Sequence, residues 1–169
     1  MELKNINDRV LFLDIDGVLN SRVYYKYLYN PENGNSRLDP YCVILVRRLV
    51  EEFALKIVIT STWRNGVENR LHRELQEHGL LDYLHQDGYT PVIRPANRGN
   101  EIELWLQNHS EVKDYIIIDD NENLLEHHLK RFVKTSTNLG MVQERYNHAR
   151  ELLLSYNQIT NDTNVTLEY

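Results

Sequence analysis

The feature that most constrains the fold is the stretch 10–20, which reads VLFLDIDGVLN. Its four consecutive apolar residues are typical of a strand that is buried on both faces of a parallel sheet. Ligands of such sheets bind beyond the carboxyl ends of the strands, where Asp14 and Asp16 follow in the chain. Gly17 then permits a backbone turn that a larger residue resists. The stretch therefore predicts a pair of acids at one edge of a parallel sheet.

Further apolar runs alternate with helical patterns along the chain. The run KIVIT at 56–60 ends in hydroxyl residues, and YIII at 115–118 ends in two acids. A short strand is also predicted at 132–134. Helices are predicted at 40–53, 67–78, 100–108, 124–130 and 141–156, with Asp39 as an N-cap and Gly79 as a stop. This alternation predicts an α/β fold, a three-layer α/β/α sandwich with a mainly parallel, Rossmann-like sheet.

The chain length of 169 residues suits one domain spanning 1–169. The tyrosine-rich segment 21–38 returns through a turn-rich stretch and is predicted to be a small cap insertion over the site. Its tyrosines suit either a lid that stacks on a base or simple packing. We expect 80–95 to be loop with at most one strand, and the polar segment 157–169 to be a loosely held tail.

Composition excludes some classes of protein. The formal charge of −6 argues against strong non-specific binding of nucleic acid, and no apolar run approaches the roughly 20 residues that cross a bilayer. The single cysteine, Cys42, has no intramolecular disulfide partner, and the first residues are charged where a signal peptide is apolar. We therefore expect a cytoplasmic protein without a membrane partner. The oligomeric state stays open.

Reactive side chains come directly after three of the predicted strands, and one more comes just before a predicted helix. In a parallel sheet they converge, and they are Asp14, Asp16, Thr60, Ser61, Arg98, Asp119 and Asp120. Carboxylates suit Mg²⁺, whereas the seven histidines show no spacing typical of a zinc site, and His127-His128 is interpreted as a solvated helix face. A carboxylate can attack phosphorus when a metal neutralises the repulsion, and a hydroxyl and a cation can stabilise the transition state. These residues predict phosphoryl transfer.

The residues also resemble a known family. DIDGV at 14–18, Thr60 after KIVI, Arg98 before a helix, and Asp119-Asp120 after YIII resemble the four motifs of the haloacid dehalogenase superfamily. LDIDGVLN, ITSTWR, RGNEIELWL and IIIDDNEN are similar to the small phosphatase domain associated with RNA-repair proteins. The resemblance covers most of the chain.

The resemblance implies a role for each residue. Asp14 would be the nucleophile that becomes aspartyl phosphate, and Asp16 the general acid and base. Thr60 would bind the phosphate, with Ser61 as an alternative or a helper, and Arg98 would hold the nucleophile and the phosphate, with Arg94 as the alternative. Asp119 and Asp120, together with Asp14 and the Asp16 carbonyl, would hold Mg²⁺.

The predicted function is that of a Mg²⁺-dependent phosphomonoester hydrolase. The resemblance favours a nucleotide or polynucleotide 3′-phosphate as its substrate, and the negative charge favours short substrates. Two alternatives stay open, a module that captures phosphate or nucleotide without turnover and a metal-dependent nuclease. Trp63, which follows the second strand, is interpreted as a packing residue.

Overall fold

A computed structural model describes residues 9–65 and 70–165, with side chains as far as 155. Its centre is a sheet of five parallel strands in the order β3-β2-β1-β4-β5. The strands are β1 (Arg9–Leu13), β2 (Lys56–Ile59), β3 (Leu84–Tyr89), β4 (Asp114–Asp119) and β5 (Phe132–Lys134). The predicted α/β class and parallel sheet are therefore confirmed.

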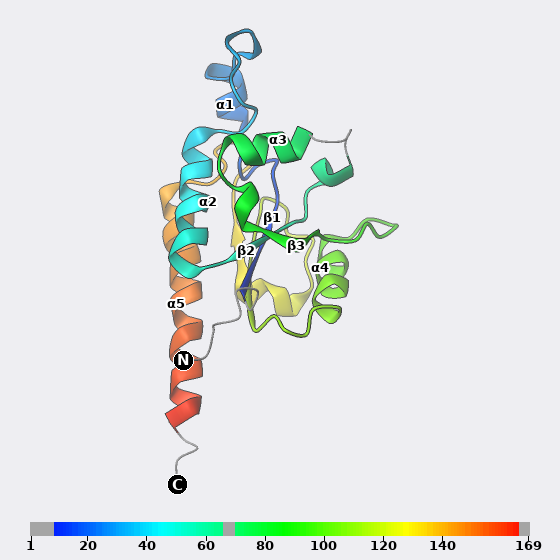
Figure 1. The fold of residues 1–169 in the computed structure, drawn as a ribbon, viewed down its shortest axis with the longest axis vertical. Helices are drawn as coiled ribbons and strands as arrows, with labels where there is room; N and C mark the ends of the chain where they lie inside the picture. Colours follow the sequence, from blue (N-terminus) through cyan, green and yellow to red (C-terminus); the bar gives the residue numbers. More distant parts are fainter. Residues whose placement is uncertain (1–8, 66–69, 166–169) are drawn as a thin grey trace.

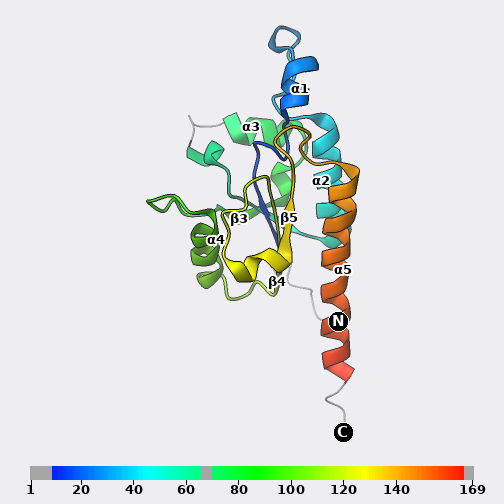
Figure 2. The ribbon, with the colours of Figure 1, turned by 180° about the vertical axis from the view of Figure 1, so that it is seen from behind.

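Helices cover both faces of this sheet, as Figures 1 and 2 show. The helices α2 (Pro40–Phe53) and α5 (Gln143–Val165) pack side by side on one face, and α4 (Arg98–Gln107) lies on the other. A shorter helix, α3 (Arg70–Glu77), follows β2 in the chain. The remaining turns of helix are α1 (Arg22–Tyr27) and the 3₁₀ segments η1 (Pro31–Asn33), η2 (Thr62–Asn65), η3 (Leu81–Tyr83) and η4 (Glu126–Arg131).

The central strand β1 is buried on both faces, as its apolar run predicts. Leu11 and Leu13 belong to the core that α2 and α5 cover, whereas Phe12 packs in a second core with Ile102 and Trp105 of α4. Because alternate residues of a strand face opposite sides, a strand between two helical layers needs apolar residues at every position. The apolar run at 10–13 therefore places β1 in the middle layer.

Several predicted element ends are confirmed and others are wrong. The Asp39 side chain caps α2 by accepting from the Tyr41 amide at 3.0 Å, and Gly79 adopts a φ of +65° after α3. Val67, predicted in that helix, lies outside the described residues. The helix predicted at 100–108 begins two residues earlier, because Asn97 caps it through the Asn100 amide at 3.0 Å.

Further observations concern irregular or polar sequence. The stretch 80–95 contains β3, the one strand that the prediction allowed there, whereas the helix predicted at 124–130 is the 3₁₀ segment η4. The last helix does not end at Tyr156 but continues to Val165, and Figure 1 shows it extending past the sheet. The loosely held tail at 157–169 stays a prediction. In the described part of the chain, no helix is long and apolar enough to span a bilayer.

The segment 21–38 stands beyond one end of the strands, where Figure 1 shows α1 at the top of the molecule. Its base is fixed, because the amides of Arg22 and Val23 donate to carbonyls of the loop that follows β5. Tyr24 is buried and its hydroxyl donates to the Ser36 carbonyl at 2.7 Å, whereas Tyr25 and Tyr27 are exposed. Packing therefore explains Tyr24, and the Tyr25 ring also contacts the Tyr29 ring at a centroid distance of 5.3 Å, whereas Tyr27 is largely exposed.

Candidate active site

Strand register brings three of the predicted site residues together. Leu13 at the end of β1 pairs with Ile59 of β2 and with Ile118 of β4. The next residues are Asp14, Thr60 and Asp119, so they lie at the same level of the sheet. Backbone hydrogen bonds continue the pairing, since the Asp14 amide donates to the Ile118 carbonyl at 3.1 Å and the Thr60 amide to the Leu13 carbonyl at 3.0 Å. The convergence follows from the parallel pairing of adjacent strands.

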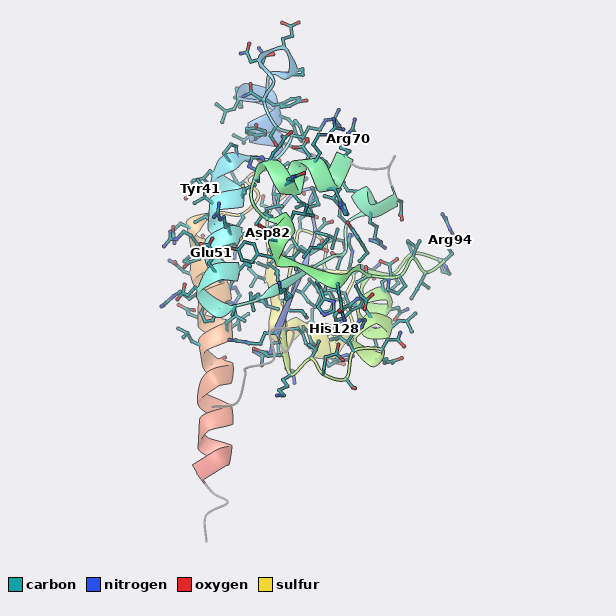
Figure 3. The ribbon with its side chains drawn as sticks, in the orientation of Figure 1. Tyr41, Glu51, Arg70, Asp82, Arg94 and His128 are labelled. Atoms are coloured by element: carbon teal, nitrogen blue, oxygen red, sulfur yellow. The ribbon has the colours of Figure 1, made fainter. Side chains whose placement is uncertain are left out.

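Arg98, the first residue of α4, contacts two of these residues. One of its guanidinium nitrogens lies 3.3 Å from Asp14 Oδ1 and 3.3 Å from Asp119 Oδ2. Arg94 makes no such contact, and Figure 3 shows it at the tip of the loop that follows β3. Of the two arginines considered from the sequence, Arg98 is therefore the one that lies between the acids.

The acids outnumber the cations in this cluster. Single oxygens of Asp14, Asp119 and Asp120 lie within 4.8 Å of one another, and Arg98 is the guanidinium that contacts two of them. Burial raises the pKa of Asp14, although Arg98 and a hydrogen bond from Ser61 oppose this shift. Burial and then the Asp14 charge raise the pKa of Asp119 to about 7. Because ionised carboxylates are not compensated here, the cluster favours an added positive charge.

The donor set fits Mg²⁺. Asp119 is fully buried, and its Oδ2 accepts no hydrogen bond although Arg98 is near. Clustered carboxylate oxygens are the hard ligands that Mg²⁺ prefers, and an unused buried oxygen is available for such a bond. The Asp16 carboxylate does not belong to this group of oxygens.

Asp16 is exposed and held by two residues. Its Oδ1 accepts from the Asn20 side chain at 2.9 Å, and its Oδ2 accepts from the Trp63 indole at 2.9 Å. Trp63 packs against the core, as interpreted from the sequence, and its indole N–H in addition donates to the site residue Asp16. Its place in the chain, shortly after Thr60, indicated that it lies near the site but not that its indole N–H is directed at Asp16. The site thus has one solvent-facing acid whose orientation is fixed.

Gly17 is required by the turn that places Asp16. Its φ is +75°, in the left-handed region, and an added Cβ would lie 2.3 Å from Asp120 Oδ2. Asp120 is itself held, since the Thr137 hydroxyl donates to it at 2.6 Å. A side chain at position 17 would therefore strain the turn and displace an acid.

The hydroxyls of Thr60 and Ser61 differ in their surroundings. Thr60 Oγ1 is buried without a hydrogen-bond partner, and Thr60 lines a cavity of about 340 Å³ together with Arg98. Ser61 is already engaged, because its hydroxyl bonds to Asp14 and accepts from the Trp63 amide at 3.4 Å. A buried hydroxyl without a hydrogen-bond partner destabilises the folded protein. Thr60 is therefore a better candidate than Ser61 to form a hydrogen bond with a ligand.

A buried ion pair that the sequence did not reveal supports this region. Arg64 of η2 contacts Glu101 of α4 at 2.7 Å, with side chains 6% and 5% exposed. Arg64 also donates to the carbonyls of Thr60 and Ser61. The pair therefore ties the end of β2 to α4, which carries Arg98.

Comparisons with known proteins agree with this geometry. A family model described as the HAD domain in Swiss Army Knife RNA repair proteins matches residues 10–146, which include every site residue described above. No curated protein and no solved structure matches the chain. Since the family model covers most of the sequence, the chain belongs to this family of HAD domains from RNA repair proteins.

Proposed function

We propose that this protein is a Mg²⁺-dependent phosphomonoester hydrolase that acts through an aspartyl-phosphate intermediate. The observation that carries the proposal is the buried Asp14 beside Arg98 and Asp119, with the unpartnered hydroxyl of Thr60 at the same level of the sheet. Phosphoryl transfer needs a positioned nucleophile and donors for the charged equatorial oxygens. These residues supply both.

The residues divide the reaction between them. A carboxylate oxygen of Asp14 attacks phosphorus, and the bond from phosphorus to the leaving oxygen breaks as Asp16 donates a proton to that oxygen. Asp16 then takes a proton from water, which attacks phosphorus and releases inorganic phosphate and the Asp14 carboxylate. Thr60 and Arg98 hold the phosphate oxygens. A Mg²⁺ ion held by Asp14, Asp119 and Asp120 would offset the repulsion between nucleophile and phosphate.

The proposed substrate is a nucleotide or a polynucleotide end, with the 3′-phosphate preferred. Membership of a family named for RNA repair proteins supports this class. The short insertion at 21–38 leaves room for a bulky carrier of the phosphate, because a site that encloses a small metabolite needs more cover.

Phosphate release from a panel tests the proposal. The panel contains nucleoside monophosphates, 3′- and 5′-phosphorylated oligonucleotides and sugar phosphates, each with Mg²⁺ and with a chelator. We expect turnover of phosphorylated ends that the chelator stops and added Mg²⁺ restores. Binding of every phosphate without release would indicate a capture module, and cleavage of an unphosphorylated oligonucleotide would indicate a nuclease.

A further inference from the structure

The cavity that begins at Thr60 and Arg98 extends to the loop between β3 and α4. Its volume of about 340 Å³ is at the lower end for sites that bind small molecules. Val92 and Ile93 of that loop form an apolar wall, and Asn123 of the turn after β4 lies among its polar lining. The cavity therefore offers room beside the proposed phosphate position for the group that carries the phosphate.

The walls of this cavity are held by α4. The Ile93 amide donates to Glu101 at 3.2 Å, and the Gly99 amide donates to the Asn123 carbonyl at 3.0 Å. The approach at Gly99 is close, because an added Cβ would lie 2.6 Å from the Leu125 amide nitrogen. One helix start thus fixes both walls, so the cavity exists before any ligand enters.

Among the described residues, one of the arginines that line the cavity has no acidic partner. Arg64 is neutralised by Glu101 at 2.7 Å, and Arg98 faces Asp14 and Asp119. Arg94 is exposed, lines the cavity, and makes no hydrogen bond or ion pair within residues 9–65 and 70–155. Figure 3 shows it at the tip of the loop. The positive charge at the outer end of the cavity is therefore not compensated by any residue that the structure describes.

We infer that the cavity binds the nucleoside that carries the terminal phosphate, and that Arg94 binds the next phosphodiester along the strand. This inference rests on the proposed function and narrows its substrate to phosphorylated oligonucleotides of at least two residues. The apolar wall suits the sugar or base, and the asparagine amides suit its polar edges. A guanidinium binds phosphate oxygens through paired N–H groups, and a mononucleotide offers no second phosphate to it.

A pair of matched substrates tests the role of Arg94. The first is a 3′-phosphorylated dinucleotide with an ordinary phosphodiester, and the second has an uncharged methylphosphonate in its place. We expect kcat/KM to be about fivefold higher for the charged linkage, the size of one partly exposed charged contact. The Arg94→Ala variant should bring the ratio near one, and Arg94→Lys should retain part of it. Arg145→Ala, a control on α5 across the sheet, should keep the wild-type ratio.

The outcomes separate this inference from the proposed function. If the wild-type protein releases phosphate from no monoester, the proposed function fails. If it shows equal kcat/KM for the charged and the uncharged linkage in both the 3′- and the 5′-phosphorylated pairs, or if Arg94→Ala keeps the wild-type ratio, the proposed function stands and the subsite is wrong. The same pair with a 5′-phosphate reports polarity, and a preference confined to that pair supports the subsite while it contradicts the 3′ preference.

Discussion

Strand β4 carries a buried aspartate at each end, and the two have opposite surroundings. Asp114 at its start lies 3.1 Å from Arg9 and 3.1 Å from Arg131, so one carboxylate meets two guanidinium groups. Asp119 at its end shares Arg98 with Asp14, so two buried carboxylates meet one guanidinium. Burial raises the pKa of both aspartates, and at Asp114 the two arginines oppose the shift.

The difference separates a structural ion cluster from a binding site on the same strand. Arg9 and Arg131 also donate to the carbonyls of Leu153 and Leu152 in α5, so the cluster at Asp114 attaches the last helix to the sheet. Within the part of the chain that the structure describes, nothing comparable neutralises Asp14 and Asp119. Buried charges that the protein itself does not neutralise are typical of a functional site, because a bound ligand can supply the opposite charge.

The largest expected effect is that of Asp14→Asn on turnover. The amide cannot attack phosphorus, so we expect kcat on an aryl phosphate to fall by at least about a thousandfold. Because one of two close buried carboxylates becomes neutral, the melting temperature without metal should stay the same or rise. Wild-type activity in this variant would overturn the assignment of the nucleophile.

Asp114→Ala should give the opposite result. It leaves two partly buried arginines without a counter-ion, which we expect to lower the free energy of unfolding by about 3 kcal/mol. Urea denaturation measures this loss, and kcat of the folded protein should not change. A stable Asp114→Ala variant with reduced kcat would contradict the division into a structural end and a functional end.

Arg98→Ala tests the single guanidinium at the functional end. Loss of one donor aimed at the transition state costs about 3 kcal/mol, so kcat/KM on an aryl phosphate should fall about a hundredfold. Arg131→Ala is the matched control, since it removes an arginine from the other end of the sheet. Equal small losses in both variants would remove Arg98 from the site.

The smallest effect concerns His128, which packs against Tyr115 near the Asp114 end. It is fully buried, and burial followed by the charge of His127 lowers its pKa, while Glu103 opposes the shift. The unfolded chain therefore takes up a proton below about pH 6.5 that the folded chain does not, and stability falls as pH decreases from 6.5 toward the lowered pKa. His128→Gln should flatten this slope by at most about 1.4 kcal/mol per pH unit, measured by urea denaturation between pH 5 and 7. An unchanged slope would show that His128 does not contribute.

The sequence predicted the backbone frame of the site better than its side-chain contacts. Asp14, Thr60 and Asp119 were predictable because each ends an apolar run, and parallel pairing aligns such ends. The choice between Arg94 and Arg98 depended on where α4 begins, which the Asn97 cap decides. Trp63 and Asn20 could not be assigned to Asp16, because their directions depend on the turns that carry them.

Two other differences have separate origins. Of the pair His127-His128, predicted to be a solvated face, only His127 is exposed. His128 is buried against Tyr115. The length of α5 was not predictable from apolar spacing, because the sequence after Tyr156 is polar and carries no such pattern. Polar sequence can extend an existing helix without a buried face, as propagation is easier than nucleation.

The contact between Trp63 and Asp16 also gives the protein an internal optical probe. The chain has two tryptophans, and Trp105 is buried and stacked on His109 at a centroid distance of 3.7 Å. Its emission therefore forms a steady background. Trp63 reports on the mouth of the site, so its fluorescence can follow the arrival and departure of ligands without a label.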